Sequence, residues 1–255
     1  MTMTKWSRSI IGVAILVAGF WIAPRANAQQ ATATPKPAQG AFEVTSLLGR
    51  KLYAQTDDGT IAAARKKLAA DPINAKLVVA LSQAQAGRRQ YREAVATCTK
   101  GLASAPNSVD LLVERGHREL GLRRFAAAQK DLERAAALDS KKTDVYYHLG
   151  LAHYFQGQFD AAAAAFRKGL ALAPDNDSVI DFSNWLYVSL RRANKPDDAA
   201  KVLEKITPDL KNTGPHYAFY LRLLHFYQGA IPEAQTLPAK PKDRMTSRRS
   251  WRSTP

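Results

Sequence analysis

Residues 146–150 read YYHLG, residues 158–162 read QFDAA, and Phe166 and Pro174 follow. Residues of the same kinds recur 34 positions earlier, and again 34 positions before those. The equivalent positions are Leu81-Ser82, Arg115-Gly116 and Leu149-Gly150; Tyr91, Phe125 and Phe159; Ala94, Ala128 and Ala162; Cys98, Leu132 and Phe166; Gly101, Ala135 and Gly169; and Pro106, Ser140 and Pro174.

This order of large apolar, glycine, aromatic, alanine and proline positions is the tetratricopeptide-repeat (TPR) pattern. Two antiparallel helices cross closely only where their side chains are small, as at Gly150 and Ala162. Proline near the end of a repeat stops the second helix. Each hairpin leaves an apolar face that only its neighbour covers, so we expect an all-α, right-handed α-solenoid of TPR helix hairpins. Three repeats are clear, and degenerate repeats are expected at both ends.

Helical spacing of apolar residues continues on either side of these repeats. Upstream it predicts a worn helix pair that ends at Asp71-Pro72, and downstream it predicts a pair whose register slips relative to the period, then capping helices. The helices expected outside the three repeats run over 42–54, 61–70, 179–193, 197–206, 217–228 and 232–236.

The two ends of the chain differ from this pattern. Lys5 and Arg8 precede an apolar run over 10–22, and Ala26-Asn27-Ala28 offers a cleavage site, so residues 1–28 are predicted to be a signal peptide. A membrane anchor is the alternative, but this run is shorter than the roughly 18 apolar residues that a crossing needs. We expect a disordered linker over 29–41, the TPR solenoid over 42–235 and a basic disordered tail over 236–255, in a protein exported to the periplasm or beyond the cell.

The positive charge is concentrated in one of these ends. Of the formal net charge of +15, the signal contributes +3 and the residues after Pro238 contribute +5, which leaves +7 on the body. A mildly basic body indicates little about a partner, whereas the tail is basic enough to contact an anionic surface.

The sequence also resembles a family of exported bacterial TPR proteins to which no function is assigned. The resemblance extends from about Ser46 to Gly229. It rests on these stretches: Ser46-Leu47-Leu48-Gly49-Arg50, Gly87-Arg88-Arg89, Tyr91-Arg92-Glu93-Ala94, Arg115-Gly116-His117-Arg118, Tyr147-His148-Leu149-Gly150, residues 184–192 and residues 220–229. This chain lacks an insertion that the family carries between the second and third repeats. The resemblance implies the fold and names no activity.

Catalytic and metal motifs are absent from the sequence. Glu114 and His117 have the spacing of di-iron bundle ligands, but no second such pair occurs. His148 and His153 are five apart and face different sides of a helix. Cys98 is the single cysteine, and its apolar alanine-rich surroundings indicate a buried thiol. We therefore expect no enzyme activity, no cofactor and no metal.

The first helix of each TPR hairpin supplies the inner wall of a solenoid, and its wall positions predict a binding groove for a protein or peptide partner. Large apolar and aromatic residues there are typical of interface anchors, although packing between repeats is the alternative for the aromatic ones. The predicted groove residues are Val79, Gln83, Val113, His117, Tyr147, Leu151, Tyr154 and Trp185.

Paired arginines support a second hypothesis. They fall in or near the turns between the two helices of successive hairpins, so they would line one edge of the stack and bind an anionic polymer or membrane surface together with the tail. No aromatic residues are interleaved with them to read bases, so nucleic-acid recognition is not expected. The pairs are Arg88 with Arg89, Arg123 with Arg124 and Arg191 with Arg192.

Overall fold

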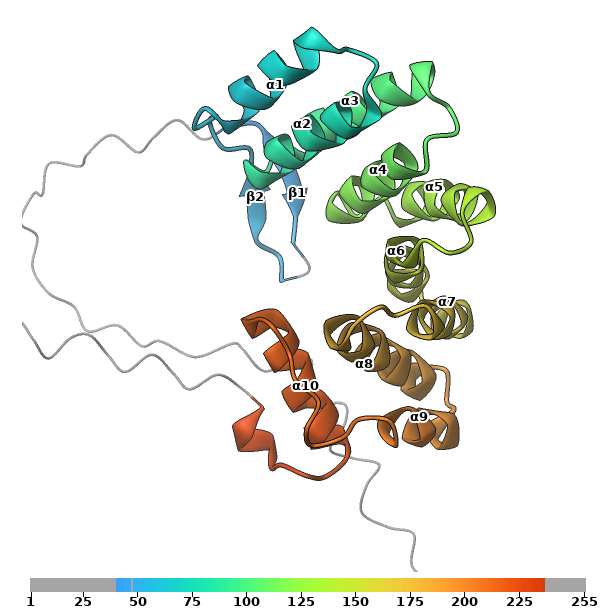
Figure 1. Cartoon of the computed structure of the whole chain (residues 1–255). Coiled ribbons are helices and arrows are strands. Elements are labelled where there is room, and N and C mark those ends of the chain that lie inside the picture. Colours follow the sequence, from blue (N-terminus) through green and yellow to red (C-terminus); the bar gives the residue numbers. More distant parts are fainter. Residues whose placement is uncertain (1–39, 47, 237–255) are drawn as a thin grey trace, which may run out of the picture. The chain divides into compact units, whose positions relative to one another are not determined.

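The computed structural model describes residues 40–46 and 48–236, and this part of the chain is mostly helical. The predicted signal peptide, almost all of the predicted linker and the basic tail after Thr236 lie outside the described residues. Figure 1 labels the strands and the α-helices, which are β1 (Phe42–Thr45), β2 (Lys51–Tyr53), α1 (Thr60–Ala70), α2 (Ala75–Gly87), α3 (Tyr91–Ser104), α4 (Val109–Gly121), α5 (Phe125–Leu138), α6 (Thr143–Phe155), α7 (Phe159–Ala171), α8 (Asn176–Arg192), α9 (Pro196–Leu203) and α10 (Pro215–Tyr227). A 3-10 turn, η1 (Glu233–Gln235), follows α10.

The three predicted repeats are confirmed as the hairpins α2–α3, α4–α5 and α6–α7. Their first helices begin at Ala75, Val109 and Thr143, which are 34 residues apart. The side chain of Asn74 accepts hydrogen bonds from two backbone amides at the start of α2, and Ser108 accepts one at the start of α4. These caps satisfy amides that have no partner within the helix, so they determine where each of these two hairpins begins.

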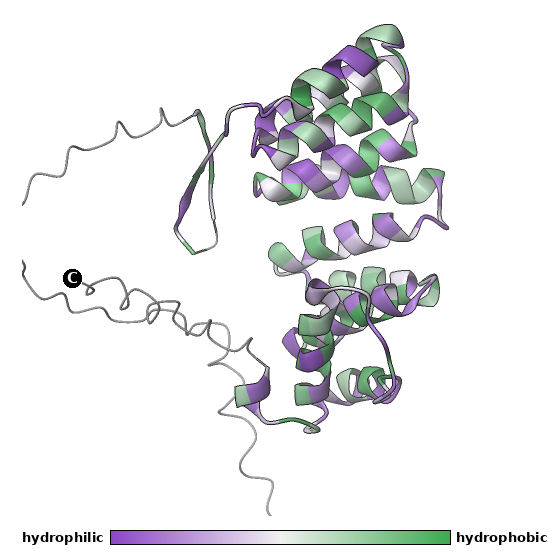
Figure 2. Ribbon diagram, turned by 60° about the vertical axis from the view of Figure 1, so that its left-hand side comes forward, coloured by the Kyte–Doolittle hydropathy of each residue, from purple (hydrophilic) through white to green (hydrophobic). Residues whose placement is uncertain are grey.

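Neighbouring helices contact one another along the chain from α1 to α9, and the first helices of successive hairpins also contact each other. Each helix from α1 to α9 therefore packs against another helix. Hydrophobic and hydrophilic residues alternate along the helices in Figure 2, as expected for helices with one buried and one exposed face. Cys98, Leu132 and Phe166, which share one repeat position, are all fully buried. Repeated burial of the same position is what a stack of hairpins requires. Among the described residues, no helix is both long enough and apolar enough to cross a membrane.

The fourth hairpin, α8–α9, explains the predicted slip in register. Helix α8 has 17 residues, whereas α2, α4 and α6 have 13 each. Its second helix, α9, consequently begins 37 residues after α7 instead of 34. Helix α10 then packs on α8 through Leu221 and Leu224. The downstream helix pair and the capping helix are thus confirmed, with bounds shifted by a few residues.

The helix expected over 42–54 is wrong: this segment is an antiparallel β-hairpin. The apolar spacing of Val44, Leu47 and Leu48 imitates a helical stripe, but Val44 and Thr45 favour strands and Gly49 takes the left-handed conformation with φ of 76°. The hairpin is held to the stack by Glu43, which is buried and accepts the backbone N–H of Arg92 at 3.0 Å. The upstream element is therefore a hairpin followed by α1, and not a worn repeat.

The turn inside each helix hairpin contains one residue in the left-handed conformation. The residue is Arg89, Arg123, Gly157 and Asn194 in the four hairpins, with φ between 56° and 77°. Only glycine adopts this conformation without steric cost, and asparagine tolerates it better than arginine does. The chain geometry at these turns is therefore imposed by the stack.

This geometry predicts opposite effects at equivalent turn positions. Gly157→Ala should lower the free energy of unfolding by about 1 kcal/mol because it adds a Cβ to a left-handed residue. Arg89→Gly should raise it by about 0.5 kcal/mol, since glycine removes that strain but gives the unfolded chain more freedom. Urea denaturation of the two variants checks both signs; a stabilised Gly157→Ala protein would contradict the assignment of the turn.

Candidate functional site

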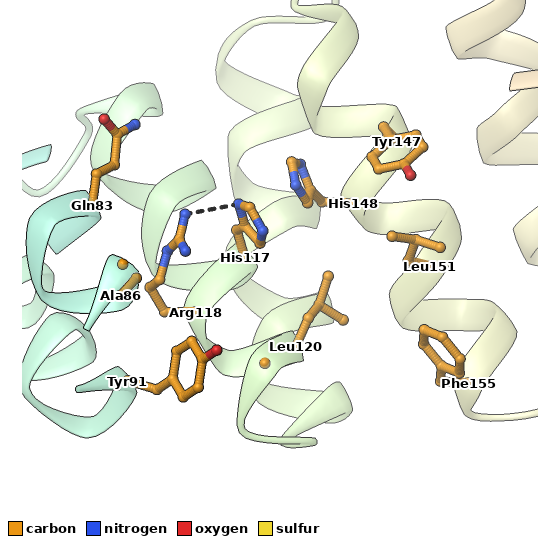
Figure 3. A pocket seen from close by; sticks show the side chains of 12 residues that line it. Gln83, Ala86, Tyr91, His117, Arg118, Leu120, Tyr147, His148, Leu151 and Phe155 are labelled. Carbon is orange, nitrogen blue, oxygen red and sulfur yellow. Dashed lines mark hydrogen bonds between the residues drawn. The ribbon is translucent and has the colours of Figure 1, made fainter. Parts of the chain in front are cut away.

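A hollow with a cavity volume of about 560 Å³ lies on the wall formed by α2, α4 and α6, the first helices of the three regular hairpins. Tyr91, the first residue of α3, closes one side of it. Figure 3 shows side chains from successive helices that point into the same space. The lining residues are Gln83, Ala86 and Gly87 of α2; Tyr91; His117, Arg118, Leu120 and Gly121 of α4; and Tyr147, His148, Leu151 and Phe155 of α6.

Four of the predicted groove residues lie in this hollow: Gln83, His117, Tyr147 and Leu151. They come from three helices and from positions 34 residues apart, as Gln83, His117 and Leu151 show. Stacking of identical hairpins places equivalent side chains next to one another, which is why the period predicted this set.

The other four predicted groove residues do not line the hollow. Val113 is buried in the core, and Val79 packs against the same core cluster. Tyr154 and Trp185 pack edge to face with ring centroids 5.3 Å apart, and Trp185 also stacks on Phe166 at 6.0 Å. These two aromatic residues therefore contact neighbouring repeats, the packing alternative that their position in the sequence left open.

Sequence reasoning missed Tyr91, Arg118, His148 and Phe155 as lining residues. Tyr91 and Phe155 extend the apolar lining beside Leu120 and Leu151, and Phe155 is 36% exposed although its ring stacks on Phe125. The repeat pattern could have indicated Tyr91, because this residue occupies the aromatic position of the first repeat. His148 precedes a core leucine, and nothing in the sequence shows on which side of that leucine the ring lies.

A buried polar chain supports the edge of the hollow from behind. Ser82 donates a hydrogen bond of 2.7 Å to Glu114, and Arg118 Nε lies 2.8 Å from the same carboxylate oxygen. The side chains of Glu114 and Arg118 are 6% and 13% exposed. A buried carboxylate is stable only when it is paired and hydrogen-bonded, so this arrangement fixes the position of Arg118.

Two imidazole rings lie side by side in the hollow (Figure 3). The centroids of His117 and His148 are 4.3 Å apart, with the ring planes inclined by 35°. The protein atoms around the recess desolvate both rings and so lower their pKa, although the His117 side chain is itself exposed; the positive charge of Arg118 lowers both pKa values further, and the backbone carbonyl of Asp144 acts in the opposite sense on His148. His117 keeps contact with solvent while it stands in a recess among three helices. Both rings are neutral at pH 7.

The lowered pKa values of His117 and His148 predict how stability changes with pH. In the unfolded chain each ring takes up a proton near pH 6.5, whereas the folded protein takes it up at lower pH. Between these values the unfolded state binds more protons, so stability falls as the pH decreases. Thermal unfolding between about pH 7.5 and pH 5 should show a shallower decrease in Tm for the His117→Gln/His148→Gln variant than for the wild type. Parallel curves would contradict this prediction.

Most of the predicted arginine edge is engaged within the protein. Arg88 forms an ion pair with Asp58 at 3.2 Å, and Arg124 forms one with Glu119 at 3.3 Å. The remaining contacts are between Arg123 and the Thr45 carbonyl, between Arg191 and the Tyr187 hydroxyl, and between Arg192 and the ring of Phe159. In the part of the chain described, only Arg89 of the six has no side-chain contact of this kind. Because two of the six arginines are paired with carboxylates, the net positive charge of this edge is smaller than the sequence indicates.

Glu114 and His117 have the spacing of metal ligands on one helix, but their side chains lie in different places. Glu114 faces Ser82 and Arg118 in the interior, whereas His117 lines the hollow. Within residues 40–46 and 48–236 no group of three or more histidine, cysteine, aspartate or glutamate residues is placed to hold a metal ion. Cys98 is buried, and desolvation raises the pKa of its thiol to about 11, which is the behaviour of an unreactive core residue.

Comparison with known proteins identifies the repeats. Residues 113–177 match the family model described as tetratricopeptide repeat. The Hsp70-Hsp90 organizing protein of Triticum aestivum is 34% identical over 110 residues, which are 43% of this chain and 18% of that protein. RNA polymerase II-associated protein 3 of Mus musculus is 32% identical over 87 residues, or 34% of this chain and 13% of that protein. This chain spans less than a fifth of the length of these relatives.

Solved structures share the architecture. A crystal structure of MamA superposes with a TM-score of 0.51 at 22% identity and covers 68% of this chain and 91% of its own. TTC0263, a thermophilic TPR protein in Thermus thermophilus, gives a TM-score of 0.51 at 17% identity, over 65% of this chain and 89% of its own. At these identities the likeness shows the fold alone. The chain therefore contains tetratricopeptide repeats and folds as a tetratricopeptide-repeat solenoid.

Proposed function

We propose that this protein is a non-catalytic adaptor or scaffold that binds a segment of a partner protein in the hollow on α2, α4 and α6. The observation that carries the proposal is that successive helices leave apolar side chains, Leu120, Leu151 and Phe155, around one open space. Apolar surface in contact with water is unfavourable, and a cluster of it framed by polar groups is typical of an interaction site.

The class of fold supports the same proposal. Stacked helical repeats present a continuous inner wall, and proteins of this architecture use that wall for binding. The wheat relative is named as an organiser of two other proteins, Hsp70 and Hsp90. Only the coarser property, capture of a protein partner, is proposed for this chain, because its residues cover a small part of that relative.

The compartment of the partner is proposed from the N-terminus. Lys5 and Arg8, the apolar run over 10–22 and the small residues 26–28 support export with cleavage after Ala28. The partner would then be a periplasmic or extracellular protein. Fractionation of cells that produce the full chain, with N-terminal sequencing of the mature protein, tests this part of the proposal: a cytoplasmic protein that retains Met1 would contradict it.

Binding in the hollow is tested by selecting peptides from a random displayed library against the full chain. Gln83→Arg places a long charged side chain at the exposed edge of the hollow, so a selected peptide should bind at least about tenfold more weakly. Ala96→Arg is the matched control, because Ala96 is exposed on α3 and does not line the hollow. The dissociation constants are measured by fluorescence anisotropy. Equal weakening by both variants, or by neither, would contradict binding at this site.

A further inference from the structure

The two imidazoles in the hollow differ in what their Nδ1 atoms contact. Arg118 Nη2 lies 3.0 Å from His117 Nδ1, and the backbone carbonyl oxygen of Asp144 lies 2.8 Å from His148 Nδ1. A guanidinium group can only donate hydrogen bonds, and a carbonyl oxygen can only accept them. His117 Nδ1 must therefore be the acceptor in its contact, while His148 Nδ1 must be the donor in its own.

These contacts fix opposite tautomers in the two neutral rings. The proton of His117 is on Nε2, because its Nδ1 accepts from Arg118, whereas the proton of His148 is on Nδ1 and leaves Nε2 with a free lone pair. Glu114 restrains Arg118, because its carboxylate accepts a hydrogen bond from Arg118 Nη2 at 3.3 Å and lies 2.8 Å from Nε, and Ser82 in turn donates to Glu114. Protonation of His148 would remove its acceptor, and its lowered pKa keeps the ring neutral.

The two Nε2 atoms are free to meet a ligand. Among the described residues neither of them has a hydrogen-bond partner, and both side chains line the hollow. The side chain of His148 is half-buried, and its Nε2 is not sealed from solvent. The wall therefore presents one N–H donor and one lone-pair acceptor on rings 4.3 Å apart.

This pair discriminates between kinds of ligand group. A carboxylate can only accept hydrogen bonds, so its oxygen would face the lone pair of His148 Nε2 without a proton between them. An ammonium group can only donate, so its N–H would face the N–H of His117. One residue of an extended polypeptide presents its N–H and its C=O on the same side, as in the hydrogen-bonded pairs of an antiparallel sheet. The apolar side chains of Leu120, Leu151 and Phe155 are available beside it for neighbouring side chains of the same peptide.

We propose that His117 and His148 together bind the main chain of an extended segment of the partner, with His117 Nε2–H donating to a backbone C=O and His148 Nε2 accepting the backbone N–H of the same residue. The proposal deepens the function proposed above and rests on it. Hydrogen bonds to the main chain do not depend on which side chains the partner carries. The apolar lining of the hollow would then select the side chains of the partner. Arg118, Glu114 and Ser82 are positioning residues that set the tautomer of His117.

The tautomers can be measured directly in the full chain without any ligand. A two-bond ¹H–¹⁵N correlation spectrum of the histidine rings at about pH 7.5 distinguishes a protonated from an unprotonated ring nitrogen. His117 is expected to carry its proton on Nε2 and His148 on Nδ1, and the single variants His117→Gln and His148→Gln assign the signals. The same tautomer in both rings would overturn the proposal.

The contact itself is tested with a peptide selected by display against the full chain. Each backbone amide of that peptide is replaced in turn by an ester, which removes one N–H donor. One ester position should weaken binding to the wild type by up to about tenfold. The His148→Leu variant should bind the unmodified peptide more weakly by a similar factor, and the ester should not weaken this binding further. The His148→Gln variant keeps a hydrogen-bond acceptor, so it should retain part of the affinity. His153→Leu on the same helix, whose ring contacts Gln158 and does not line the hollow, is the control.

The outcomes separate this proposal from the one on which it rests. Gln83→Arg could weaken binding of a selected peptide while each ester substitution changes the affinity equally in the wild type and in His148→Leu. In that case the hollow binds peptides, but the histidine pair does not bind their main chain. If no peptide is selected, the proposed function fails and the histidine proposal fails with it. Circular dichroism of each variant confirms that its helical content is unchanged.

Discussion

Gly150→Ala is expected to lower the free energy of unfolding by about 3 kcal/mol, more than any turn substitution. Gly150 is buried on α6 where the second helix of its hairpin, α7, crosses it. A Cβ at this position would lie against the ring of Phe166, 2.6 Å from Cδ1, and Phe166 is itself fully buried. Because that ring has no open space to move into, the two helices would have to separate.

The control for this prediction is another glycine on the same wall. Gly87 is the last residue of α2, and an added Cβ would meet nothing within 4 Å. Gly87→Ala should therefore be neutral or stabilise the protein by up to about 0.5 kcal/mol through helix propensity. Urea denaturation followed by circular dichroism measures both variants. A Gly150→Ala protein within about 0.5 kcal/mol of the wild type would show that the hairpins do not cross as closely as described.

Glu114→Ala should also be strongly destabilising, by about 3 kcal/mol. The substitution leaves the guanidinium of Arg118 and the hydroxyl of Ser82 without their shared carboxylate in a place that water scarcely reaches. The cost comes mainly from the unpaired buried charge, and much less from the lost attraction of the pair. A variant that removes both charges, Glu114→Leu/Arg118→Leu, should therefore recover most of the lost stability.

The comparison of the single and double variants decides this point. If the double variant is less stable than Glu114→Ala, the pair contributes a favourable interaction energy and the desolvation argument is wrong. Loss of Arg118 should also release the tautomer of His117, so the ring signals described above should change in the double variant while those of His148 stay as they are. This second readout distinguishes a positioning role of Arg118 from a purely structural one.

The fold was largely predictable because its information is repeated. Each repeat needs small residues where its two helices cross, as at Gly116 and Gly150 or at Ala94, Ala128 and Ala162. One such pattern is weak evidence for a fold, but three copies at a constant spacing are specific. The segment over 42–54 had no second copy, and its apolar spacing fitted a short helix as well as it fits the hairpin that forms. The 34-residue spacing could not predict the length of α8 either. Extra residues within a helix shift all following positions out of that spacing, so equivalent residues can no longer be matched.

The candidate site was predictable in part for the same reason. Stacking carried Gln83, His117 and Leu151 into one hollow, since equivalent positions become neighbours. The surroundings of His117 depend on side-chain directions and on a carboxylate paired across helices, and the hydrogen bond from Ser82 to Glu114 joins residues 32 positions apart. Glu114 and His117 have the spacing of a ligand pair, which the lack of a second such pair already argued against; in the structure Glu114 lies in the core and His117 on the wall.

Peptide binding in the hollow on α2, α4 and α6 can be followed residue by residue in solution. It is tested most directly by mapping backbone amide chemical-shift changes in the full chain as a selected peptide is added. We expect the largest changes in α4 and α6 around His117, His148 and Leu151, smaller ones at Gln83, and none along the exposed face of α3 around Ala96. Changes confined to the β-hairpin, to the turn arginines or to α10, with the hollow unaffected at saturation, would contradict it.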